Sequence, residues 1–109
     1  MSRPSIGSMR HRLVLEAVSR ADDGGGGATE TWNPVAVVWA AVTPMTGDEN
    51  VAAEAQMGRL THVVHIRHRP GVLPAMRLRF GVRLLEIVAV LDVDERRRRL
   101  KILCRERDL

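Results

Sequence analysis

Three histidines recur at every third position in the second half of this 109-residue chain, at His62, His65 and His68. Imidazole is a common zinc ligand, so this spacing suggests a metal site and, with it, a small metal-dependent enzyme. The surrounding residues alternate between apolar and polar, as in a β-strand, where the middle histidine points away from the other two. His62 and His68 also lie too far apart along a strand to share one ion. We therefore expect no metal site.

Other patterns for catalysis are weak. The single cysteine, Cys104, alternates with apolar residues of the last predicted strand and is expected to be a buried, inert thiol. The run Gly24–Gly27 lacks the Gly-x-x-x-x-Gly-Lys-Ser/Thr pattern of a phosphate-binding loop, and we interpret it as a linker. Asp92, Asp94 and Glu95 lie among arginines, where surface charge balance explains them. We expect neither enzymatic activity nor a cofactor.

Arginine gives the strongest positive signal. One group surrounds a predicted turn, and a second group fills the turn before the last strand. The first consists of Arg67, Arg69, Arg77, Arg79 and Arg83, and the second of Arg96, Arg97, Arg98 and Arg99. Guanidinium groups bind phosphate through paired hydrogen bonds, whatever the base sequence. A solvated face, or salt bridges to a neighbouring acidic surface, explains the arginines as well, because no aromatic residues are interleaved with them for base stacking.

Charge is distributed unevenly along the chain. Residues 1–58 carry a net charge of −3 and residues 59–109 one of +7, within a total of +4. Hydrophobic residues make up 45% of the chain but only three are aromatic, so we expect one domain, 1–109, with an aliphatic core. No stretch is long and apolar enough for a membrane span, and the first residues lack the apolar segment of a signal peptide. We therefore expect no membrane association, and we expect the chain to be made in the cytoplasm.

Alternating hydrophobicity predicts six short strands separated by turn residues. They cover residues 10–18, 29–42 with a bulge or edge at Asn33-Pro34, 60–68, 76–80, 83–93 and 99–107. The apolar run of the fifth strand is expected to be largely buried, and Trp32, Trp39 and Phe80 are expected to face inward. Six antiparallel strands of this kind favour a small, mainly β protein, a six-stranded antiparallel β-barrel, because closure removes exposed strand edges.

Three segments fall outside these strands. Residues 1–8 are expected to form a flexible N-terminal arm, and residues 21–28 a glycine-rich, mobile hairpin tip. Residues 44–59 form a long inter-strand connection. Thr46 to Glu49 has the spacing of a capping box and Gly58 suits the position after a helix, so we predict one short helix in this connection.

Taken in order, the chain resembles the phage head-tail joining family, whose members close the capsid after DNA packaging. The resemblance is carried by Met9–Leu13, Gly26–Trp32, Val38–Pro44, Gly47–Glu49, Thr61–His62, Ile66–Gly71, Met76–Arg77 and Val93–Arg96. It implies a β-barrel with one short helix and no catalysis. It also implies a ring of identical subunits, a stopper in the neck of a virion or gene transfer particle, through which double-stranded DNA passes.

In such a neck the partners are a portal-side adaptor on one side and a tail terminator or tail-tube protein on the other. The first arginine group then becomes a candidate for the DNA channel, and the second for contacts between subunits or with partners. A compact globule of this length is about 34 Å across, so six in a ring leave a bore of about 34 Å and twelve one of about 100 Å. The smaller bore favours a hexamer, with a dodecamer possible only for subunits that are strongly wedge-shaped or elongated.

The connection 44–59 is the candidate channel gate, because a segment that moves without unfolding the barrel must be a long loop. Its acidic residues Asp48, Glu49 and Glu54 would repel phosphate and are further channel candidates. A helix that only packs on the barrel explains the segment equally well. The alternative function is a stand-alone nucleic-acid-binding β-barrel, which the basic second half supports and the lack of exposed aromatic residues opposes.

Overall fold

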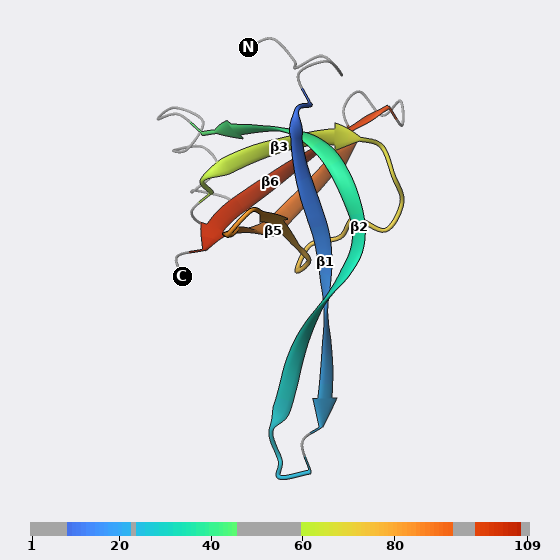
Figure 1. Cartoon of the computed structure of the whole chain (residues 1–109), viewed down its shortest axis with the longest axis vertical. Coiled ribbons are helices and arrows are strands. Elements are labelled where there is room, and N and C mark those ends of the chain that lie inside the picture. Colours follow the sequence, from blue (N-terminus) through green and yellow to red (C-terminus); the bar gives the residue numbers. More distant parts are fainter. Residues whose placement is uncertain (1–8, 23, 46–59, 93–97, 108–109) are drawn as a thin grey trace.

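The computed structural model describes residues 9–22, 24–45, 60–92 and 98–107. They form six strands: β1 (His11–Asp22), β2 (Ala28–Pro44), β3 (His62–Arg67), β4 (Arg77–Phe80), β5 (Arg83–Asp92) and β6 (Arg99–Arg107). Every neighbouring pair is antiparallel, and the order β1-β2-β3-β6-β5-β4 closes into a barrel (Figure 1). The six-stranded antiparallel barrel predicted from the sequence is thus confirmed.

The described residues contain no helix. The helix and gate expected in residues 44–59 fall on residues 46–59, which lie outside the described part of the chain, as do the expected arm 1–8 and the acidic candidates Asp48, Glu49 and Glu54. No helix within the described ranges is long and apolar enough to cross a membrane.

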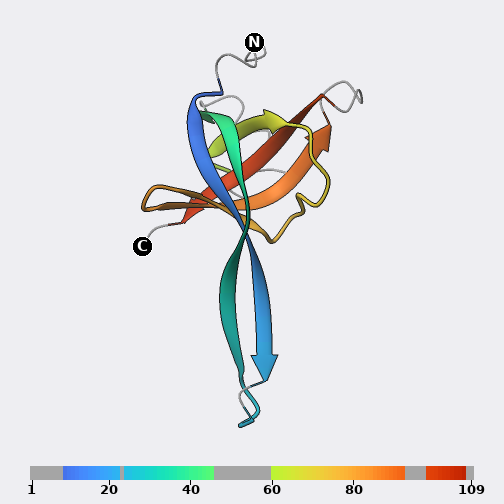
Figure 2. The ribbon, with the colours of Figure 1, turned by 45° about the vertical axis from the view of Figure 1, so that its right-hand side comes forward.

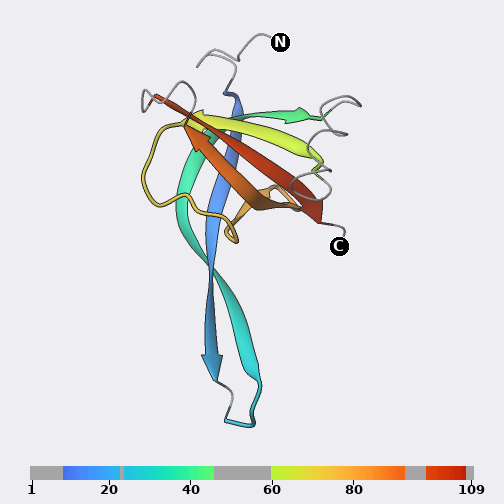
Figure 3. The same ribbon diagram turned by 180° about the vertical axis from the view of Figure 1, so that it is seen from behind.

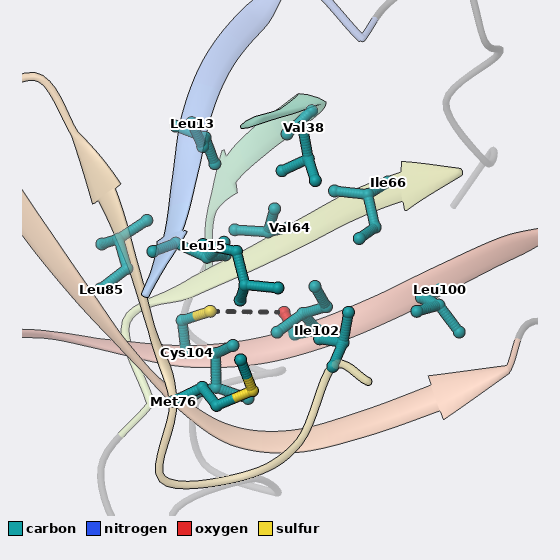
Figure 4. Close-up of a cluster of buried hydrophobic side chains, with 14 residues drawn as sticks. Leu13, Leu15, Val38, Val64, Ile66, Met76, Leu85, Leu100, Ile102 and Cys104 are labelled. Atoms are coloured by element: carbon teal, nitrogen blue, oxygen red, sulfur yellow. Dashed lines mark hydrogen bonds between the residues drawn. The ribbon is translucent and has the colours of Figure 1, made fainter. Parts of the chain in front are cut away.

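The core is aliphatic, as the composition predicts. Alternate residues of each strand point into the barrel, among them Leu13 and Leu15 of β1, Leu78 of β4 and Ile102 of β6, all at most 1% exposed. Cys104 lies in the same cluster, and its thiol donates to the carbonyl oxygen of Ile102 at 3.8 Å (Figure 4). Burial raises the pKa of this thiol to about 12, which makes it a core residue rather than a nucleophile.

A two-stranded arm extends from the barrel. β1 and β2 continue beyond the other strands as a twisted hairpin, which all three ribbon views show as a separate projection (Figures 1, 2 and 3). Every residue of Ser19–Asp22 and Ala28–Thr31 is exposed. The molecule measures 51 × 29 × 27 Å, so the spherical subunit assumed for the ring estimate is wrong in shape. The arm accounts for the extra length.

A bulge marks the place where β1 and β2 leave the barrel. Leu15 pairs with Ala36 and Glu16 with Pro34, so Val35 is the extra residue on β2. A bulge beside Pro34 was predicted, since proline cannot donate to the ladder. Leu15 and Glu16 are both buried although they are adjacent in sequence, because Leu15 points into the core while Glu16 is covered by Arg77 and Arg79 of β4.

Two predictions of side-chain direction are wrong. Trp39 is 59% exposed and points outward, because Val38 and Ala40 occupy the inward positions of β2. In β5, Leu85 and Ile87 are buried but Leu91 is 46% exposed, so the run is not largely buried. A register shift between Ile87 and Ala89 reverses which residues of β5 face the main core. In both strands consecutive residues are apolar, so hydrophobicity alone could not fix the inward phase.

Candidate interaction surfaces

A buried ion pair joins the arm to the barrel. The register of β1 and β4 places Glu16 opposite Arg77, and Arg77 Nε donates to Glu16 Oε1 at 2.6 Å. Arg79 reaches the second carboxylate oxygen at 3.2 Å. The guanidinium of Arg77 also stacks over the half-buried ring of Trp32 at 4.1 Å. Arg77 is therefore engaged on two sides, whereas Arg79 keeps half of its side chain exposed.

A second network joins the ends of β3, β5 and β6. Arg83 donates to both oxygens of Glu106, from Nε at 2.9 Å and from its terminal nitrogen at 2.8 Å. The same terminal nitrogen lies 3.3 Å from His62 Nε2, and His62 Nδ1 lies 2.9 Å from Thr61 Oγ1. Because arginine can only donate, Nε2 of His62 is the acceptor and Nδ1 carries the proton.

The charges of this network support that assignment. Burial is the main cause that lowers the pKa of His62, and Arg83 lowers it further while Glu106 opposes the shift. The hydrogen bond from Arg83 is the main cause that lowers the pKa of Glu106. His62 is thus held neutral beside an ionised Glu106, and the group is a structural clasp rather than an acid–base pair.

The third feature is a pocket of about 470 Å³ on the barrel. Its lining consists of Met9, Val37, Val38, Trp39, Ile66, Arg67, His68 and Arg69. The exposed ring of Trp39 and two guanidinium groups therefore meet at one place. The Nε of Arg69 is buried and has no hydrogen-bond partner within the described structure. None of the described carboxylates pairs with Arg67 or Arg69.

A row of cations lies beside this pocket across β3 and β6. Arg67 pairs directly with Arg99, and His65 pairs with Lys101. Burial lowers the pKa of His65, with further lowering from Lys101 and then Arg99. Arg98 is exposed, and its carbonyl oxygen accepts the His68 N–H at 3.0 Å. Arg96 and Arg97 lie outside the described residues.

The structure divides the first arginine group among three places. Arg67 and Arg69 lie at the end of β3, Arg77 and Arg79 lie on β4 beside Glu16, and Arg83 lies at the clasp with Glu106. The sequence predicts all five around one turn, because nothing in it indicates that β4 pairs with β1. The pocket could not be predicted either, because the apolar run Val35–Trp39 does not show which of its side chains face outward.

The histidines do not converge on a metal site. In the described ranges no three side chains of histidine, cysteine, aspartate or glutamate are grouped to hold an ion. His62 belongs to the clasp, while His65 lies across from Lys101. These contacts explain both side chains without a ligand role.

Comparison with known proteins gives the architecture a context. The family model described as phage head completion protein matches residues 4–107. No curated protein matches the chain in sequence. The solution structure of protein SF1141 from Shigella flexneri 2a is 29% identical, with a TM-score of 0.76 over 94% of this chain and 96% of that one. A chain in the virion of a native gene transfer agent particle is 26% identical, with a TM-score of 0.67 over 98% of both chains.

Proposed function

Because the chain belongs to the phage head completion protein family, we propose that it is a structural subunit in the neck of a tailed phage or gene transfer particle. The match over residues 4–107 carries this proposal, and the likeness to a chain of a gene transfer agent virion over nearly its whole length supports it. The resemblance found in the sequence is confirmed. Head completion is a structural task, so the chain is a virion protein rather than an enzyme.

The neck subunit forms a ring of identical copies between a portal-side adaptor and a tail terminator or tail-tube protein, with double-stranded DNA in the central channel. The closed barrel supports this arrangement, because the barrel part of the sheet is a rigid body without free strand edges. Six barrels 27 to 29 Å wide would leave a bore of about the same width, since six touching discs enclose a gap equal to one disc. A hexamer remains favoured over a dodecamer.

The arginines are suited to different tasks in this ring. Arg77 is largely covered and stacks on Trp32, and the guanidinium of Arg83 donates to both carboxylate oxygens of Glu106, so both serve mainly to hold the barrel together. Arg79 has one contact to Glu16 and a half-exposed side chain, and is the member of the group best placed to meet phosphate. Arg67 and Arg69 line the pocket, where a protein partner is the better match.

Removal of the chain from a particle-producing strain tests the proposal. Heads should fill with DNA, fail to acquire tails and lose the DNA to added nuclease. The parent chain and the surface variant Leu91→Ser should both restore protected DNA, because Leu91 is exposed and belongs neither to the pocket lining nor to the arm. Particles that stay filled and tailed without the chain would overturn the assignment.

A nucleic-acid-binding barrel is the second candidate, and one observation favours it. Trp39 is exposed beside Arg67 and Arg69, which is the combination that stacks and neutralises single-stranded DNA. A single aromatic residue provides only one stacking position. We expect the isolated chain to bind short oligonucleotides no more tightly than the ~10⁻⁴–10⁻⁶ M of non-specific contacts, measured by fluorescence anisotropy at increasing salt. Nanomolar binding lost in Trp39→Ala would favour the alternative.

A further inference from the structure

The arm of β1 and β2 has two exposed faces and no core of its own. Between Ser19 and Thr31 the two strands pair only with each other. An isolated two-stranded hairpin is only marginally stable in water. Side-chain contacts across the arm are few and exposed, such as Arg20 to Glu30 at 3.2 Å. A projection of this kind is suited to lie against another surface.

The tip of the arm is slender and carries an acid. Gly24 and Gly26 have φ values of +82° and +85°, a backbone conformation that side chains larger than hydrogen rarely adopt. Open space surrounds the position of a Cβ at both glycines. Asp22 closes the turn by accepting the Gly24 N–H on Oδ1 at 2.9 Å. This single contact leaves Oδ2 and the second lone pair of Oδ1 for another donor.

The pocket has the opposite chemistry. Trp39 and Val37 supply apolar walls, and the exposed Arg67 and the orphaned Nε–H of Arg69 supply donors that no described carboxylate satisfies. A buried donor without a partner is costly, so an acceptor that reaches Arg69 is favoured. A short acidic segment with little side-chain bulk fits this combination of walls and donors.

The tip of the same chain cannot fill this pocket. Trp39 pairs with Arg12 near the beginning of β1, whereas Asp22 is the last residue of that strand. The ten residue steps from Arg12 to Asp22 span about 33 Å at the rise of a strand. The molecule is 51 Å long and 29 Å across, so the arm projects about 22 Å (51 − 29) beyond the barrel, which lets its tip contact a copy that lies beside it.

We propose that the tip of the arm of one copy, with Asp22, docks in the pocket formed by Trp39, Arg67 and Arg69 of the next copy. The contact joins two different surfaces, so its repetition produces a ring when the rotation closes. This inference rests on the proposed ring, and it adds the residues that link its subunits. The carboxylate of Asp22 lies between the two guanidinium groups, and the glycine turn packs on the indole.

Disulfide trapping tests the contact with two single variants, Asp22→Cys and Arg67→Cys. Mixed and oxidised, they should give a disulfide-linked heterodimer, while neither variant alone should give more than about a tenth of that yield, the ratio expected for a contact worth ~1.4 kcal/mol. The double variant should give a ladder of higher oligomers. Native Cys104 is buried and does not react. In the control, Asp22→Cys is mixed with Leu91→Cys instead of Arg67→Cys, since Leu91 is exposed on β5.

Charge exchange gives an independent readout. Without introduced cysteines, Arg67→Glu with Arg69→Glu should abolish the association of parent chains that analytical ultracentrifugation detects. Mixing this chain with Asp22→Lys should restore heterodimers in the same measurement, because the tip and the pocket then carry exchanged charges. Trapping that is equal for Arg67→Cys and Leu91→Cys, or dimers formed by Asp22→Cys alone, would overturn the proposal.

The same variants separate this inference from the proposed function. A chain that protects DNA in particles but gives no heterodimer contradicts the arm contact alone. A chain that forms the ladder but is dispensable for filled, tailed particles contradicts the neck assignment alone.

Discussion

Arg77 Nε lies 2.6 Å from Glu16 Oε1, across the two strands that close the barrel. The bond stands directly beside the bulge from which the arm departs. Glu16 is 4% exposed, and within the described ranges it is the only buried charged residue. The arm is thus attached through a desolvated ion pair, while Trp32 covers the arginine from the arm side.

Replacement of Glu16 by glutamine should strongly destabilise the fold. It leaves the guanidinium of Arg77, of whose side chain only 12% is exposed, without its charge partner, and breaking one partner of a buried pair costs about 3–5 kcal/mol in the free energy of unfolding. Urea denaturation followed by circular dichroism measures the loss. The double variant Glu16→Leu with Arg77→Met should recover much of it, because the only charge then left without its partner is the half-exposed Arg79, which water can solvate. An equal or larger loss in the double variant would show that the pair is not the cause.

The stability of the fold should decrease below about pH 6.5, the ordinary histidine value. Burial lowers the pKa of both His62 and His65 in the folded chain, so the unfolded chain takes up protons first as the pH falls. Each histidine contributes at most about 1.4 kcal/mol per pH unit to the slope. Comparison of urea midpoints at pH 7.5 and 5.5 checks this. His62→Gln with His65→Gln should flatten the dependence, and an unchanged slope would contradict it.

Glu106 adds a separate loss at lower pH. Its folded pKa is lowered, chiefly by the hydrogen bond from Arg83, so its contribution is complete above about pH 4.3 and disappears as the pH falls through the folded value. The variant Arg83→Gln, which retains a side-chain donor but not the charge, should reduce the dependence of stability on pH in the acidic range. Parallel titration of the two proteins between pH 5 and 2, followed by circular dichroism, should separate them.

The sequence predicts the barrel because its strands are short, alternating and separated by turn residues. Leu100 and Ile102 stand out as inward positions because Lys101 between them is polar, and Leu13 and Leu15 because the polar Arg12 and Glu16 flank them. The pairing of strands that are distant in the sequence is harder to predict. Glu16 and Arg77 are 61 residues apart, and nothing local indicates that β4 closes on β1.

The candidate site was harder to predict for the same reason. Trp39 lies in a run where inward and outward positions are both apolar, so its exposure depends on the bulge at Val35 and on the pairing with β3. Arginines grouped in the sequence have different partners in the fold, because Arg77 and Arg79 contact Glu16 of β1 whereas Arg83 contacts Glu106 of β6. The sequence shows how many arginines there are, but the residues that each of them contacts follow only from the pairing of the strands in the closed sheet.

Cys104 should be inert in the folded protein. Its side chain is fully buried and burial raises its pKa to about 12, so almost no thiolate exists at pH 8. With an aromatic disulfide reagent that releases a yellow thiolate, Cys104 should react only at the rate of unfolding. The introduced, exposed thiol of the control Leu91→Cys should react at once with one equivalent. Rapid modification of Cys104 in the parent at low denaturant would contradict the buried position.

Trp39 should matter for assembly and not for folding. Its side chain is 59% exposed, so Trp39→Ser should change the free energy of unfolding by no more than about 0.5 kcal/mol. Leu78→Ala is the matched core substitution, and since Leu78 is fully buried it should cost about 2–5 kcal/mol.

In particles, by contrast, the tryptophan variant should show a clear defect although its fold is stable. Trp39→Ser should fold like the parent yet give heads that retain less DNA, because an exposed tryptophan in a pocket rimmed by arginines is the type of residue that dominates protein contacts. Nuclease protection of packaged DNA, measured beside urea denaturation of the purified chain, checks both parts. A Trp39→Ser chain that is strongly destabilised would place the indole in the fold, and one that protects DNA as well as the parent would remove it from the interface.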